Sequence, residues 1–142
     1  MPGVALVLAR ALAADETRLD EARALLGEYA DNSFRQLRRG TFWSSLLVIS
    51  AETAYHLEFA EASRIIRDLL APFADQVAFS GSWVTAPIAY GVGVAMAGCD
   101  DPRAGQLLRH AADIAERLDA PVLVARAREA ATQGPVQRVG HL

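Results

Sequence analysis

The chain has 142 residues, of which 52% are hydrophobic and 22% charged, and its formal net charge is −3. A chain of this length and composition is typical of one globular domain with a buried core, and its negative charge disfavours direct binding to nucleic acid. None of the 14 Lys and Arg residues is a lysine, which excludes a P-loop and a Schiff-base enzyme.

The amino-acid composition also indicates the source of the protein and its cellular compartment. The 28 alanines and the absence of lysine indicate a GC-rich coding sequence, and therefore a bacterial protein. Cys99 is the only cysteine, which excludes an intrachain disulfide and a multi-cysteine metal site. We therefore expect a cytoplasmic protein with no metal ion and no cofactor. The most apolar run, 84–99, is shorter than the roughly 20 residues that span a bilayer, so we expect no membrane association.

Hydrophobic periodicity predicts an all-α chain. The helices are expected at residues 3–14, 18–30, 41–56, 59–71, 87–98, 102–118 and 121–132. The longest connector, 75–85, contains strand-like residues at 77–79, which are too few to predict a sheet. Residues 1–132 are expected to form a single helical-repeat domain. The segment 133–142 contains Gly and Pro and is expected to be a flexible C-terminal tail.

One short phrase occurs three times, at residues 21–26, 61–66 and 103–108. Its alanines, Ala22, Ala62 and Ala104, are 40 and then 42 residues apart. A period of this length is typical of stacked antiparallel helical hairpins, here about three hairpins and a C-terminal capping helix. We expect the three alanines to be buried at equivalent positions on the second helix of each hairpin.

The Ala/Leu pattern of residues 45–130 resembles a known family. The resemblance is carried by the segments 72–74, 83–98, 104–118 and 121–128. They are similar to the tetratricopeptide-like helical region of large bacterial ATP-dependent transcriptional regulators of the LuxR and MalT type, and of adenylate-cyclase-linked ATPases. The resemblance implies a region that mediates interaction or ligand sensing, and it implies no catalytic residue.

A basic and aromatic cluster in the second connector is the main candidate for binding a partner. It comprises Arg35, Arg38 and Arg39 with Phe34, Phe42 and Trp43, and arginines of this kind pair with phosphates or acidic peptides. The alternative is a solvated linker whose aromatic residues pack on the core. Trp83, with Phe79 in the same longest connector, either anchors a partner or covers the core.

The first helix is the candidate for self-association. It is apolar nearly all round, with Arg10 as its only charge, whereas a terminal repeat normally turns a polar face to water. We expect a homodimer whose contact includes Leu6, Val7 or Leu8.

No combination of nucleophile, base and orienting group has a recognisable spacing in this sequence. Glu52 and His56 share one helix face, and Ser82 lies in the longest connector, but neither arrangement forms a catalytic set. The sequence therefore favours a non-catalytic protein-interaction or scaffold module. The alternative is a small-molecule sensor with an apolar pocket between the third, fifth and seventh helices.

Overall fold

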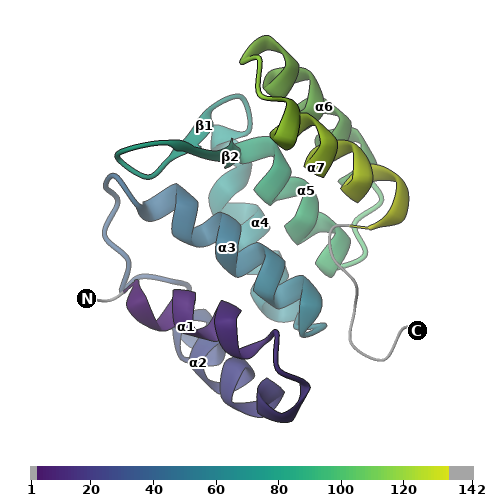
Figure 1. Ribbon diagram of the computed structural model, residues 1–142. Coiled ribbons are helices and arrows are strands. Elements are labelled where there is room, and N and C mark those ends of the chain that lie inside the picture. Colours follow the sequence, from purple (N-terminus) through teal and green to yellow (C-terminus); the bar gives the residue numbers. More distant parts are fainter. Residues whose placement is uncertain (1–2, 135–142) are drawn as a thin grey trace.

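Helices make up most of the protein (Figure 1), and the computed structural model describes residues 3–134. The described elements are α1 (Val4–Leu12), α2 (Leu19–Asp31), α3 (Trp43–His56), α4 (Ala60–Leu70), β1 (Val77–Phe79), β2 (Val84–Pro87), α5 (Ile88–Gly98), α6 (Ala104–Arg117) and α7 (Pro121–Gln133). Single 3-10 turns precede α2 and follow α4. The prediction of an all-α chain holds in part: the protein is mostly helical, but β1 and β2 form a small sheet. The predicted tail lies largely outside the described residues, because α7 includes Gln133 and the description ends at Gly134.

Helices that follow one another in the chain pack against each other, with the exception of α2 and α3. α1 packs on α2, α3 on α4 and α5 on α6, while α7 covers α6, and α3 also contacts α1 and α5. In Figure 1 these pairs follow one another from α1 and α2 at the bottom to α6 and α7 at the top right. This order is compatible with three hairpins and a cap, and their stacking as tetratricopeptide-like repeats stays a prediction.

The repeated phrase is buried in similar but not identical ways in the three second helices. Leu26, Ile66 and Leu108 are four residues after the repeat alanines, and all three lie in the core. Ala22 and Ala62 are buried as predicted, but Ala104 is only half-buried. Ala104 is the first residue of α6, where a side chain meets fewer neighbours than one turn further along the helix.

The prediction of no sheet in the 75–85 connector was wrong. β1 and β2 pair as a short antiparallel hairpin, with Ala78 opposite Ala86. Both alanines are buried, so one face of the hairpin packs on the core. Gly81 has a φ of 85° in the loop, a conformation that glycine adopts without steric cost. The predicted fifth helix therefore begins at Ile88, and Pro87 ends β2 instead of opening the helix.

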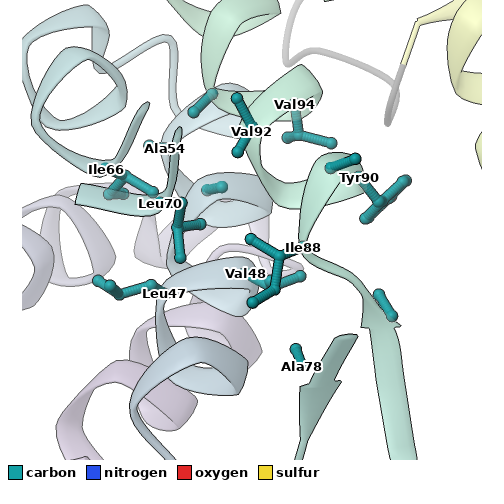
Figure 2. Close-up of a cluster of buried hydrophobic side chains, with 14 of the residues drawn as sticks. Leu47, Val48, Ala54, Ile66, Leu70, Ala78, Ile88, Tyr90, Val92 and Val94 are labelled. Carbon is teal, nitrogen blue, oxygen red and sulfur yellow. The ribbon is translucent and has the colours of Figure 1, made fainter. Parts of the chain in front are cut away.

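α5 is the central helix of the core. Figure 2 shows Val92 and Val94 of α5 in the same cluster as Val48 of α3 and Ile66 and Leu70 of α4. Glycines in α5 let these helices approach closely. Within residues 3–134, no helix has both the length and the apolarity needed to cross a membrane.

Candidate functional site

The connector 32–42 is anchored to the body of the protein. Ser33 and Phe34 have positive φ angles of 52° and 59°, which turn the chain away from α2. The Phe34 amide donates a hydrogen bond to the Tyr29 carbonyl oxygen at 2.8 Å. The Phe34 and Leu37 side chains are buried in the core. The connector is thus held at two points, and most of its other side chains are exposed.

The three arginines of the predicted cluster have different surroundings. The Arg39 guanidinium lies 4.8 Å from the centre of the Trp43 ring and 5.6 Å from that of Phe73. Trp43 and Phe73 also pack edge to face, with ring centres 5.8 Å apart. These contacts fix Arg39 and Trp43 to the end of α4. Arg35 and Arg38 are exposed, and neither forms an ion pair with any residue in the range 3–134.

A groove runs between this connector and the N-terminal ends of α1 and α3. Its volume is about 470 Å³, and its lining combines apolar side chains with one arginine and no carboxylate. The lining residues are Gly3, Leu37, Arg38, Gly40, Thr41, Phe42, Trp43 and Leu46. Phe42 is 52% exposed although it is a large aromatic residue. Shallow apolar lining beside a cation is typical of a surface that receives a side chain from a partner.

The β1–β2 hairpin reaches this connector. A Cβ atom at Gly81 would lie 3.5 Å from Thr41 Cγ2 and 3.9 Å from Phe42 Cζ, so the hairpin loop touches the residues that precede α3. Figure 1 shows the loop on the same side of the molecule as this connector. Trp83, 67% exposed, does not cover the core. The exposed side chains of the two segments form what we call the linker–hairpin surface: Arg35, Arg38, Phe42, Phe79, Trp83 and Val84.

Sequence reasoning identified most of this surface. It named Arg35, Arg38 and Phe42 in one cluster and Trp83 with Phe79 in the other, and it missed Val84. It also treated the two segments separately, whereas the fold brings them together at Gly81. The unusual density of aromatic residues near residues 42 and 79–83 was the available signal.

Only two of the three residues of α1 that were predicted to mediate self-association are exposed. Leu6 is 1% exposed, because α1 turns its Leu6, Ala9 and Leu12 side toward α2 and α3. Leu6 is therefore a core residue and is not available for a contact between subunits, which corrects the prediction. Val7 and Leu8 are about half exposed, on the opposite side of the helix. Self-association through this side stays a prediction.

Substitution of Leu8 tests that prediction. We expect the wild-type protein to dimerise at micromolar concentration, and Leu8→Glu to shift it to monomer by at least about tenfold in Kd, because a buried carboxylate in an apolar contact is costly. Multi-angle light scattering measures the change, with Val122→Glu on α7 as an exposed control. A wild-type monomer at 100 µM or more, or a dimer unaffected by Leu8→Glu, would contradict it.

The sequence suggested an apolar pocket between the third, fifth and seventh helices. The structure instead has a buried network of charged and polar side chains between α3, α5 and α7. The Tyr90 hydroxyl donates to Glu52 Oε2 at 3.0 Å, and Arg126 Nη2 donates to Glu52 Oε1 at 2.6 Å. The Arg126 guanidinium also lies 4.6 Å from the centre of the Tyr90 ring. Burial raises the pKa of Tyr90 far above its usual value, and the Glu52 carboxylate raises it further, so the hydroxyl stays a donor. This network joins α7 to α3 and α5.

The structure separates the residues considered for catalysis. Ser82 lies in the hairpin loop beside the start of α3, whereas Glu52 and His56 lie in the C-terminal half of that helix. Ten residues of helix separate position 42 from Glu52, about 15 Å. Both carboxylate oxygens of Glu52 already accept hydrogen bonds. Among the described side chains, no three His, Cys, Asp or Glu residues are grouped as metal ligands would be.

Comparison with known proteins adds no family assignment. No family model matches the chain, and no curated protein or solved structure shows significant similarity to it. The resemblance to the helical regions of bacterial regulators therefore stays an interpretation of the sequence pattern, and function is argued below from the geometry of the surface.

Proposed function

We propose that this protein is a non-catalytic protein-interaction module that binds its partner at the linker–hairpin surface. The observation that carries the proposal is the grouping of exposed aromatic side chains beside a groove. Phe42 and Trp83 are 52% and 67% exposed, in segments that touch each other. Large aromatic residues contribute much of the binding energy in protein interfaces, whereas in a monomer their exposure to water has a free-energy cost.

The buried residues that anchor the linker–hairpin surface to the core also favour a role in binding a partner. The connector is anchored by Phe34 and Leu37, and the hairpin by Ala78 and Ala86, all of which are buried. Binding to a surface that is already ordered costs less conformational entropy than binding to a mobile loop. The implied role of the resembling regions, which mediate interaction, is compatible with the proposal.

A phage-displayed peptide library selected on the immobilised protein tests the proposal. We expect enriched peptides whose affinity falls at least about tenfold in the double variant Phe42→Ser/Trp83→Ser, because each aromatic residue removed is a candidate hot spot. Fluorescence anisotropy with the synthesised peptides measures the affinities. Because both side chains are exposed, the variant should unfold at nearly the wild-type temperature.

The matched control is Leu118→Ser/Val122→Ser, which removes two exposed apolar side chains from the region of α6 and α7. It should leave the affinities within about twofold, since neither residue belongs to the linker–hairpin surface. If no peptide is enriched, or if the selected peptides bind the Phe42/Trp83 variant as well as the wild type, the proposal is wrong.

A further inference from the structure

The linker–hairpin surface is positively charged on a protein whose net charge is negative. Residues 32–51 contain three arginines and no Asp or Glu, and residues 76–99 contain no charged side chain. The whole chain has a net charge of −3. Asp75, the acidic residue directly before the hairpin segment, accepts a hydrogen bond from His110, whose Nε2 lies 2.8 Å from Oδ1. The positive charge of this surface is therefore local.

Two of these arginines are free to bind an external anion. Some exposed arginines are paired within the chain, as Arg18 is with Glu21 and Arg128 with Glu116, whereas others, such as Arg64 and Arg117, form no ion pair within residues 3–134. Arg35 and Arg38 have no carboxylate partner among residues 3–134. They lie on either side of the buried Leu37, on a backbone that is already fixed. Because the backbone is already fixed, binding of a carboxylate by these guanidinium groups costs side-chain entropy but little backbone entropy.

The groove next to Arg38 has room for an apolar side chain. Its volume of about 470 Å³ lies within the roughly 300–1,000 Å³ typical of ligand pockets. Leu37, Phe42, Trp43 and Leu46 contribute to its lining, and Arg38 is its charged lining residue. A ligand that fits this site has an apolar group that enters the groove and a negative charge that pairs with Arg38.

We infer that the partner of this surface is an acidic peptide segment with a large apolar side chain. The apolar side chain enters the groove, and flanking carboxylates pair with Arg35 and Arg38. This inference rests on the proposed function and specifies the chemistry of the partner. A peptide fits better than a nucleic acid, because the chain outside this surface is acidic and would repel a long polyanion.

The two tryptophans of the chain report binding directly, since Trp83 belongs to this surface and Trp43 lines the groove beside it. The probe is a 12-residue peptide with a Phe-Leu pair flanked by Asp and Glu. A second peptide carries Lys at each acidic position, and a third carries Ser at the Phe-Leu pair. We expect the acidic peptide to change the tryptophan emission and to bind at least about tenfold more tightly than either of the others, with an affinity that falls as salt rises. The Trp83→Phe variant leaves Trp43 as the reporter beside the groove.

Charge reversal provides the matched comparison. Arg35→Glu/Arg38→Glu should weaken the acidic peptide at least about tenfold, whereas Arg64→Glu/Arg117→Glu, with the same change in net charge, should leave its Kd within about twofold. Arg64 and Arg117 are exposed residues of α4 and α6. Equal effects of the two double variants, or equal binding of the basic peptide, would overturn the inference. Competition by a 12-nucleotide oligothymidine as strong as that of the acidic peptide would assign the surface to nucleic acid instead.

The outcomes separate the inference from the proposed function. If library-selected peptides bind at Phe42 and Trp83 but are neutral or basic, the interaction module stands and the acidic partner does not. If neither the selected peptides nor the acidic probe binds, both are wrong.

Discussion

Replacing Arg126 by alanine is expected to lower the free energy of unfolding by about 3 kcal/mol, because it removes one partner of a buried ion pair. Glu52 is buried in α3, and Arg126 Nη2 approaches its Oε1 atom at 2.6 Å. Without the guanidinium, the carboxylate keeps the Tyr90 hydroxyl as a donor but loses its compensating charge. Arg126 is itself partly exposed, so the expected cost lies at the lower end of the range for buried pairs. In thermal unfolding the change amounts to roughly 10 °C.

The matched control is on the same helix. Arg128 pairs with Glu116, and both side chains are exposed, so Arg128→Ala should cost no more than about 1 kcal/mol. A double-mutant cycle with Glu52→Gln isolates the ion pair, because Gln keeps an acceptor for Tyr90 but removes the charge. Arg126→Ala should cost clearly less in the Glu52→Gln background. Equal costs of Arg126→Ala and Arg128→Ala would show that the network does not hold α7 to the core.

Local sequence patterns predicted the helices well but not the contacts between distant segments. The positions of Leu26, Ile66 and Leu108 follow from the repeated phrase, since helical periodicity is a local property. The pairing of Glu52 with Arg126 spans 74 residues, and no spacing rule reaches that far. Glu52 is the only acidic residue of α3, and this was the one sign that it needed a partner.

Local sequence patterns also failed to predict the hairpin and the inner face of α1. The strands β1 and β2 have three and four residues, too few to show alternation, and their buried residues include Ala78 and Ala86, which have little preference for strands. α1 is apolar on all sides, so its sequence contains no stripe that marks the inner face. That Leu6 faces inward and Leu8 outward is decided by the packing of α1 on α2 and α3.

For the linker–hairpin surface, the composition of the two segments identified the residues, whereas the tertiary structure was needed to show that the segments lie together. Arg35 and Arg38 stood out as a cluster because the chain is otherwise acidic. The exposure of Phe42 depends on how the connector is anchored, and its proximity to the hairpin depends on the contact at Gly81. Neither property has a sequence signature.

The close packing of α5 leads to a second large effect, at Gly93. We expect Gly93→Ala to lower the free energy of unfolding by about 2 kcal/mol, although alanine is the better helix former by about 1 kcal/mol. A Cβ atom at this position would lie 2.7 Å from Leu108 Cγ and 3.2 Å from the Leu108 backbone nitrogen. Either Leu108 leaves its rotamer or α6 moves away from α5, and both cost packing energy in a dense core. Urea denaturation followed by circular dichroism measures the loss.

Gly27, in the middle of α2, is the matched comparison for this substitution. Its nearest neighbour to an added Cβ is Phe59 Cε2 at 3.8 Å, an ordinary contact, so Gly27→Ala should raise the free energy of unfolding by roughly 0.5–1 kcal/mol. The same chemical change thus has opposite signs in two helices. In a Leu108→Ala background, the short contacts of Gly93→Ala with Cγ and Cδ2 disappear, and the substitution should become nearly neutral. If Gly93→Ala stabilises the protein as Gly27→Ala does, α5 and α6 do not pack as closely as described, and a larger residue at position 93 would be compatible with the fold.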